Sequence, residues 1–260
     1  MAAQELASVD GTISTTGEAR ISIADDGVLR GDGVFEMIRL YAGRPFALGE
    51  HLDRLERSAA AVELSVDRSA VELEIGALLD AFGDDDAALR IVLTRGGRRL
   101  VLTERLPEWP DSARVATVTY APSGILTGVK SISYAANMQA TRIAAGRGAD
   151  EAILVRPDGI VLEAPTSAIF WVTDGELRTP SIDTGILDSI TRERILAALD
   201  VAEGAYDADD LRGAEEAFLA STTREVQPVS AVDGRELPGA PARAREASDA
   251  LRAAIERELG

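Results

Sequence analysis

The chain has 260 residues, which is long enough for one large domain or two modest ones with a sizeable core. It contains no cysteine and a single histidine, so disulfides, a cysteine nucleophile and a His- or Cys-based metal centre are excluded. The net charge of −17 argues against nucleic-acid and anionic-membrane partners, because their phosphate groups attract basic surfaces.

No apolar stretch approaches the length of about 18 residues that a membrane span requires. The start of the chain also lacks the basic residues and apolar core of a signal peptide. We therefore expect a cytoplasmic protein without a membrane segment.

Short strands and turns are predicted for residues 1–45. Ala19–Ile23 alternates between apolar and polar residues, Asp25-Asp26-Gly27 has the composition of a turn, and Val34–Tyr41 predicts a strong strand.

The strand at Val34–Tyr41 has two faces, because successive side chains of a strand point to opposite sides. Phe35, Met37 and Arg39 share one face. An arginine in line with apolar side chains can hold a substrate carboxylate beside an apolar pocket. The alternative is an edge-strand arginine that points into water.

Two amphipathic helices and a hairpin follow, and then another strand. In chain order the helices are Glu50–Leu64 and Ser69–Phe82, the hairpin strands are Leu89–Thr94 and Arg99–Thr103, and the last strand is Ala113–Tyr120.

Three arginines in these elements are candidates for binding anions. Arg54 lies about 200° around its helix from Leu52, which by itself predicts a solvated charge. Arg98 and Arg99 crowd the tip of the hairpin, where they can attract an anionic substrate or simply face water.

The composition changes after the hinge-like Pro122-Ser123-Gly124, which predicts two mixed α/β domains. We place a small N-terminal domain at residues 1–119, a linker at 120–126 and a larger domain at 127–260. In the larger domain we expect helices at 135–145, 190–201 and 241–259, and strands at 152–155, 160–163, 169–172, 216–221 and 226–229.

Lys130 is the only lysine among the 27 basic residues, and the other 26 are arginine. An amine can lose its proton near neutral pH and attack a carbonyl to form a Schiff base, which a guanidinium cannot do. The alternative is compositional, since a strong arginine bias leaves a lysine by chance.

Eight short motifs in order along the chain give Lys130 a context. They are Gly31-Asp32-Gly33-Val34-Phe35-Glu36, His51-Leu52-Asp53-Arg54-Leu55, Lys130 with Tyr134, Gly148-Ala149-Asp150-Glu151-Ala152, Asp158-Gly159 with Glu163, Thr179-Pro180, Gly185-Ile186-Leu187 with Ile190-Thr191-Arg192, and Ser221-Thr222-Thr223-Arg224-Glu225. Nearly the whole chain thereby resembles the fold-type IV pyridoxal-phosphate enzymes, also called class IV aminotransferases.

The resemblance implies an α/β fold of two domains and a pyridoxal 5'-phosphate cofactor. It implies that Lys130 is the Schiff-base lysine and that Glu163 binds the ring nitrogen, where a carboxylate keeps the cofactor an electron sink. It places Tyr134 at the ring oxygen. For the phosphate it implies Arg54, the helix N-terminus at Ile190 and Thr191, and Thr222.

The resemblance also implies homodimers, an amino donor and an α-keto acid acceptor. From the cysteine and histidine content we expect no metal. One departure is Ala168, where family members commonly carry Asn.

The sequence predicts the substrate less directly than it predicts the cofactor site. Met37 stands where branched-chain enzymes typically have glycine, and their Tyr-x-Arg is absent around Leu89–Leu93. D-amino-acid aminotransferases carry Arg-x-His after Thr-Arg-Gly, whereas here Thr94-Arg95-Gly96 is followed by arginines without histidine.

We therefore expect a transaminase for a small amino acid, including D-amino acids, or an amine. Phe35, Met37, Arg39, Arg98 and Arg99 are the candidate substrate residues. The alternatives are an aminodeoxychorismate lyase, which releases pyruvate, and a branched-chain amino-acid aminotransferase.

Overall fold

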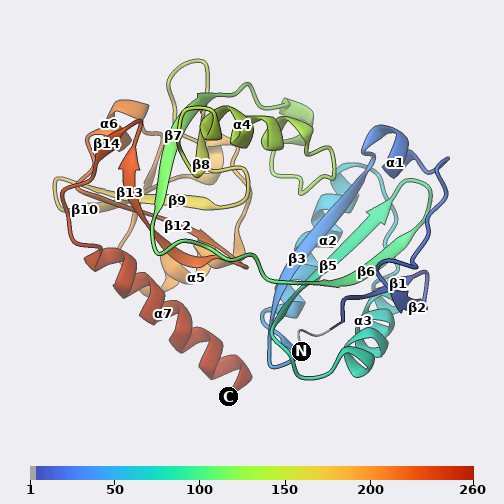
Figure 1. The fold of residues 1–260 in the computed structure, drawn as a ribbon. Helices are drawn as coiled ribbons and strands as arrows, with labels where there is room; N and C mark the ends of the chain where they lie inside the picture. The colour runs from blue at the N-terminus through green and yellow to red at the C-terminus, as the bar shows by residue number, and fades with distance from the viewer. Residues whose placement is uncertain (1–3) are drawn as a thin grey trace. The chain divides into compact units, whose positions relative to one another are not determined.

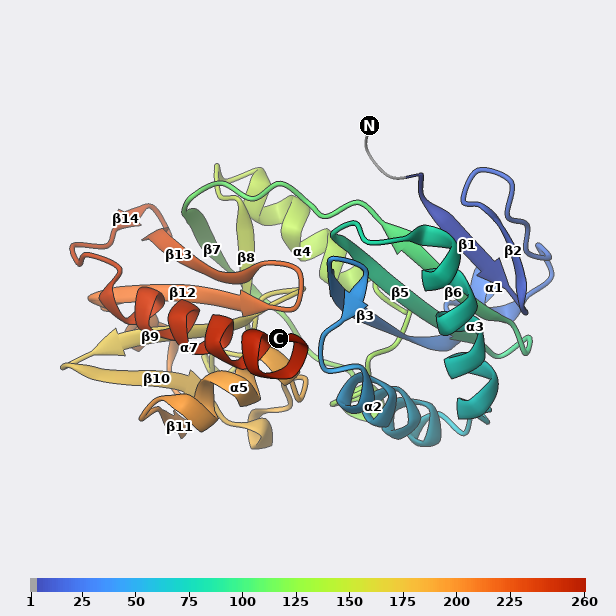
Figure 2. The ribbon, with the colours of Figure 1, turned by 90° about the horizontal axis from the view of Figure 1, so that it is seen from below.

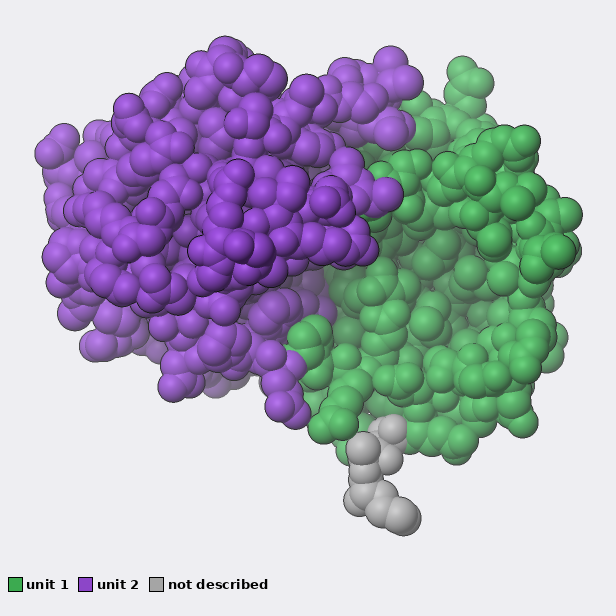
Figure 3. Space-filling view, turned by 45° about the horizontal axis from the view of Figure 1, so that its top comes forward, with its two compact units in different colours: residues 1–107, 129–134, 259 green, residues 108–128, 135–258, 260 purple. Residues whose placement is uncertain are grey.

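The structure is a computed structural model that describes residues 4–260, and its contacts divide the chain into two compact units (Figure 3). Unit 1 comprises the described residues up to Pro107 together with Val129–Tyr134 and Leu259. Unit 2 comprises Glu108–Gly128, Ala135–Glu258 and Gly260. Each unit combines helices with one β-sheet, so the predicted mixed α/β fold is confirmed.

Unit 1 is built on a six-stranded sheet in the order β2-β1-β6-β5-β3-β4 (Figure 1). Helices α2 and α3 pack on one face of this sheet. The elements are β1 Leu6–Val9, β2 Thr12–Thr15, α1 Asp26–Arg30, β3 Gly33–Tyr41, β4 Arg44–Pro45, α2 Leu48–Ala61, α3 Arg68–Phe82, β5 Ala87–Thr94 and β6 Arg99–Glu104.

The core of unit 1 lies between the sheet and these two helices. Strand β3 contributes its even-numbered residues, which share one face because strand side chains alternate. Helix α2 contributes one apolar stripe, which repeats about every 3.6 residues and packs on that face. The buried residues from these two elements are Val34, Ile38, Leu40, Leu52, Leu55 and Ala59.

Unit 2 is built on an eight-stranded sheet in the order β11-β10-β9-β12-β13-β7-β8, with β14 paired to β13 (Figure 2). Its strands are β7 Ala113–Thr119, β8 Glu151–Val155, β9 Ala168–Thr173, β10 Glu176–Pro180, β11 Ala202–Gly204, β12 Glu216–Ser221, β13 Glu225–Val232 and β14 Arg235–Glu236. Its helices are α4 Ala135–Ala145, α5 Ile190–Ala198, α6 Ala208–Arg212 and α7 Ala242–Leu259, with 3-10 turns at Gly124–Leu126 and Ile182–Thr184.

Most predicted elements are confirmed to within three residues at each end, and three predictions are wrong. Ala19–Ile23 forms no strand. The predicted turn at residues 25–27 opens α1, because the buried Asp25 caps this helix by accepting a hydrogen bond from Gly27 N at 2.7 Å. Residues 160–163 form isolated bridges to Val155 and Asp207 rather than a strand.

The compact units divide the chain differently from the predicted domains at two places. Strand β7, expected in the N-terminal domain, belongs to unit 2 because it pairs in parallel with β8 and β13. Residues 129–134, expected in the C-terminal domain, belong to unit 1 because they bond to β3. The chain therefore returns to unit 1 for the six residues that include Lys130.

Across residues 4–260 the helices are all too short or too polar to cross a membrane.

Candidate active site

The backbone around Lys130 is held by two elements of unit 1. Phe35 N in β3 donates to Lys130 O at 2.9 Å, and Ile132 N donates to Gly33 O at 3.0 Å. From the other side, Lys130 N donates to the Ser58 hydroxyl of α2 at 3.2 Å. The lysine thus lies on a short segment whose position is set by strand β3 and by the buried face of helix α2.

The Lys130 side chain lies over the Phe35 ring. Lys130 Nζ lies 4.5 Å from the ring centroid, within the range of a cation–π contact. The Tyr134 ring meets the same phenylalanine edge to face at 5.5 Å. The predicted pair of Lys130 and Tyr134 therefore shares one aromatic partner in unit 1.

A buried ionic network lies behind this strand, between β3 and α2. Arg54 donates from Nε and Nη2 to the two oxygens of Glu36, each at 2.7 Å, and His51 Nδ1 lies 2.8 Å from Glu36 Oε2. The Glu36 side chain is 0% exposed and that of Arg54 is 6% exposed. The helix face on which Arg54 was predicted to be solvated is therefore buried, and its charge is paired.

The network changes the acid–base behaviour of two of its members. Burial by itself raises the pKa of Glu36, but the bonds from Arg54 and His51 outweigh it and hold the pKa at about 2. Burial lowers the pKa of His51, and the positive charges of Arg54 and Lys130 act in the same direction against its bond to Glu36. The stable state at neutral pH is thus an ionised Glu36 with a neutral His51.

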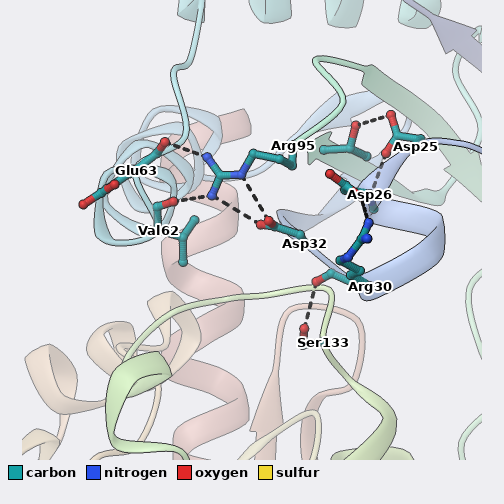
Figure 4. A network of polar contacts seen from close by, with 11 residues as sticks. Asp25, Asp26, Arg30, Asp32, Val62, Glu63, Arg95 and Ser133 are labelled. Atoms are coloured by element: carbon teal, nitrogen blue, oxygen red, sulfur yellow. Dashed lines mark hydrogen bonds and ion pairs between the residues drawn. The ribbon is translucent and has the colours of Figure 1, made fainter.

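A second network fixes the start of β3 against the end of α2 (Figure 4). The Arg95 guanidinium binds Asp32 at 3.1 and 3.3 Å and also donates to the carbonyls of Val62 and Glu63 at 2.5 and 2.7 Å. These carbonyls follow the last turn of α2, where a cation is favourable. Ser133, three residues after Lys130, donates to Gly31 O at 2.8 Å, so the lysine segment is tied to the same turn.

In unit 2, Glu163 lies at the end of the short segment after β8. Its Oε1 accepts a hydrogen bond from Leu187 N at 3.0 Å, and the side chain is half-buried. Ser189 caps α5, so Ile190 and Thr191 are the first two residues of that helix, and both are buried. A carboxylate and a helix N-terminus are the groups that a pyridinium nitrogen and a phosphate need, respectively.

Thr222 lies in the tight turn between β12 and β13, where Ser221 pairs with Glu225. The next residue but one, Arg224, is buried and braces the turn. It donates to Glu151 at 2.8 Å and to Gln227 at 2.6 Å, and its guanidinium lies 3.9 Å from the Trp109 ring centroid.

The candidate substrate residues do not all lie on one face of the unit 1 sheet. Phe35, Met37 and Arg39 alternate with the helix-facing residues of β3, and Arg39 stacks on Tyr41 with 4.9 Å to the ring centroid. Arg99 points to the helix side, where it binds the buried Glu74 at 2.7 Å. Arg98 is at the exposed hairpin tip and binds Asp10 at 2.7 Å.

Sequence reasoning assigned no role to Glu36, His51 or Arg224. The signal for Glu36 was present, since strand alternation places this carboxylate among Val34, Ile38 and Leu40 on the apolar face, where an acid requires a partner. Arg224 had no comparable signal because two of its partners, Glu151 and Trp109, lie far from it in sequence.

Among the described residues, 4–260, no cluster of three or more His, Cys, Asp or Glu side chains could hold a metal ion.

Comparison with known proteins gives one consistent result. The family model for class IV aminotransferases matches residues 33–232. The chain is 34% identical over 244 residues to a putative branched-chain-amino-acid aminotransferase of Methanocaldococcus jannaschii, covering 84% of each chain. It is 32% identical over 256 residues to a D-alanine aminotransferase of Bacillus licheniformis, covering 89% of this chain and 90% of the relative.

The fold is similar to that of a fold IV transaminase, CpuTA1, from Curtobacterium pusillum. The TM-score is 0.87 at 30% identity, with 95% of this chain and 98% of the other covered.

Proposed function

Since the chain belongs to the class IV aminotransferases, we propose that it moves the amino group of a small amino acid, including D-amino acids, to an α-keto acid. Enzymes of this family use pyridoxal 5'-phosphate. The cofactor supplies an electrophilic aldehyde and a ring that accepts the electrons of the substrate Cα–H bond.

The observation that carries the proposal is Lys130. It is the only lysine of the chain, and β3 and α2 fix its backbone. We assign it the covalent attachment of the cofactor aldehyde and, once released, the transfer of a proton at the substrate Cα. The Lys130 amine lies over the Phe35 ring, and the Tyr134 ring contacts the same phenylalanine. We assign the Tyr134 hydroxyl to the ring oxygen of the cofactor.

The donor set of the chain fits the rest of the cofactor. We assign Glu163 to the ring nitrogen, because a carboxylate there keeps the ring protonated. We assign Arg54, the first amides of α5 at Ile190 and Thr191, and the Thr222 hydroxyl to the phosphate, because cations, helix N-termini and hydroxyls bind phosphate.

The preference for small substrates is supported by Met37, which is half-buried on the same strand face as Phe35. A methionine here fills space that a glycine would leave for a branched side chain. Arg39, Arg98 and Arg99 remain our candidates for substrate carboxylates. We also propose a homodimer, which light scattering of the purified protein would test.

Absorption spectroscopy of the purified holoenzyme tests the function. Addition of D-alanine or another small donor should shift the cofactor band, and pyruvate should restore it. A spectrum that stays unchanged with D-amino acids, L-amino acids and amines alike would contradict transamination. Release of pyruvate together with 4-aminobenzoate from aminodeoxychorismate, without an amino acceptor, would assign the lyase reaction instead.

Lys130→Ala tests the role of the lysine. We expect turnover to fall at least about 100-fold, the lower range of what a positioned proton-transfer group contributes. Lys130→Arg is the control, because it keeps the positive charge without a usable amine and should be equally inactive. Turnover retained by either variant would contradict the assignment.

A further inference from the structure

The loop between β12 and β13, which carries Thr222, has a strained backbone. It consists of residues 222–224, and Ser221 pairs with Glu225 across its base. Glu225 has a φ of 58°, in the left-handed region that residues other than glycine rarely adopt. Such a conformation costs free energy and persists only where the surrounding structure fixes it. The loop is therefore held in one specific shape.

Arg224 is the residue of the loop that enters the core of unit 2. Its side chain is 2% exposed, and its Nη2 donates to Glu151 of β8, 7% exposed, at 2.8 Å. Its Nη1 donates to Gln227 at 2.6 Å, and its backbone N donates to the Ser221 hydroxyl at 3.4 Å. A buried ion pair keeps one arrangement, because separating the partners leaves a charge without compensation.

The segment at Trp109 and Pro110 covers the guanidinium group. The guanidinium carbon of Arg224 lies 3.9 Å from the Trp109 ring centroid, and Gln227 Nε2 donates to Pro110 O at 2.6 Å. All of these residues belong to unit 2. Arg224 is thus held by protein groups on several sides, which suits a support for the loop rather than a cation that binds a ligand.

We propose that Arg224 and Glu151 are positioning residues for the cofactor phosphate. The pair holds residues 222–224 in the shape in which the Thr222 hydroxyl binds the phosphate, and neither residue contacts the cofactor itself. Loss of the pair therefore weakens binding of the phosphate and leaves binding of the ring unchanged. The proposal rests on the proposed function, in which Thr222 is assigned to the phosphate, and it names the residues on which that contact depends.

Glu151→Gln in the full-length protein tests the proposal, because it removes the charge and keeps the size of the side chain. After removal of the cofactor, the protein is titrated with pyridoxal 5'-phosphate and with pyridoxal, which has the same aldehyde but no phosphate. Absorbance gives both dissociation constants. We expect the value for pyridoxal 5'-phosphate to rise about 10- to 100-fold, as for loss of one charge-assisted hydrogen bond. The value for pyridoxal should stay the same.

Thr222→Ala tests whether the pair acts through this threonine. The substitution should by itself raise the dissociation constant of pyridoxal 5'-phosphate. Glu151→Gln added to Thr222→Ala should then have a much smaller effect than it has alone, because two changes that remove the same contact are not additive. An equal effect of Glu151→Gln with and without Thr222 would overturn the proposal.

Asp210→Asn is the matched control. Asp210 pairs with Arg178 at 2.7 Å and accepts a bond from the Trp171 indole at 2.7 Å, so it also joins an arginine and a tryptophan in unit 2. These partners lie on β10 and β9 rather than in the loop. Both dissociation constants should stay unchanged in this variant.

Arg224→Lys is the second variant. It keeps the positive charge but loses the planar fork, so it should give an intermediate affinity for pyridoxal 5'-phosphate. Far-UV circular dichroism identifies a variant that has not folded, and Arg224→Lys carries the test if Glu151→Gln is such a variant.

Three results decide the matter. The same affinity for pyridoxal 5'-phosphate in Glu151→Gln and Asp210→Asn would overturn the proposal and leave the transaminase function standing. Equal weakening of pyridoxal 5'-phosphate and pyridoxal would also overturn it, because a purely structural role predicts that result. A wild-type protein that binds the phosphate with this dependence on Glu151 but reacts with no amino donor would contradict the proposed function and leave the positioning role standing.

Discussion

Two bidentate arginine–glutamate pairs lie on opposite faces of the unit 1 sheet and differ mainly in burial. Arg54 of α2 and Glu36 of β3 pair between the helix and the sheet, with side chains 6% and 0% exposed. Arg90 and Glu104 are on the other face, each 30% exposed. The hydrogen-bond geometry of the two pairs is nearly the same, at 2.5–2.9 Å.

This difference in burial predicts that the two ion pairs differ in rigidity. Removing one partner of a buried pair leaves an uncompensated charge away from water, so the pair persists in one arrangement. A partly hydrated pair gains little from staying closed, so it can exchange partners. The Glu36–Arg54 pair therefore suits a fixed support for the Lys130 region, whereas the Arg90–Glu104 pair can open and re-form.

The largest expected effect comes from Glu36→Gln. The amide cannot neutralise Arg54, and breaking a buried pair typically costs about 3–5 kcal/mol of unfolding free energy. Urea unfolding followed by circular dichroism measures this loss, and hydrogen exchange should show faster opening of α2 and β3. A loss below 1 kcal/mol would contradict the description of this pair as a rigid support.

The acid sensitivity of the same pair is the next effect. The pKa of Glu36 is about 2 in the folded protein and 4.5 in its unperturbed state, so the folded state favours the ionised form. The stabilisation is fully present above pH 4.5 and is lost as the pH falls towards 2. Its size is about 3 kcal/mol, from about 1.4 kcal/mol per pKa unit.

Comparison with Glu36→Gln isolates this contribution from the other carboxylates. The wild-type protein should lose about half of its advantage in unfolding free energy over the variant as the pH is lowered from 5 to 3, and most of the rest as it falls towards 2. His51 acts with the same sign, because its lowered pKa favours the neutral form and stability is lost as the pH falls below 6.5. A constant difference between the two proteins would show that Glu36 is not the group that titrates.

Much of the fold could be predicted because, in most elements, the hydrophobic period and the residues at the two ends indicate the same structure. Strand β3 and helices α2, α3 and α4 combine a clear hydrophobic period with polar or glycine residues at their ends. Ala19–Ile23 failed because alternation in a short polar segment does not guarantee a partner strand. The turn prediction at Asp25 failed because this side chain caps α1 through Gly27 N and also accepts a 2.9 Å bond from Thr94, a partner on β5 that is 69 residues away.

The site was less predictable where a residue depends on a distant partner. Lys130 stands out in composition alone, but Arg54 lies on a helix position that pattern analysis assigns to water. The buried Glu36 makes that position favourable for an arginine. The contact of Arg90 with the Phe35 ring could not be predicted, because it depends on the register of β3 with β5, which the sequence of β5 does not contain.

The smallest expected effect is on the stability of Glu104→Gln, and it completes the comparison of the two pairs. The side chains of both partners are in contact with water, so the variant should lose less than about 1 kcal/mol of unfolding free energy. The same substitution, Glu to Gln, is then made opposite an arginine on each face of one sheet, with burial as the main difference. Urea unfolding of the two variants under one set of conditions measures the contrast. Equal losses would mean that burial does not distinguish the pairs.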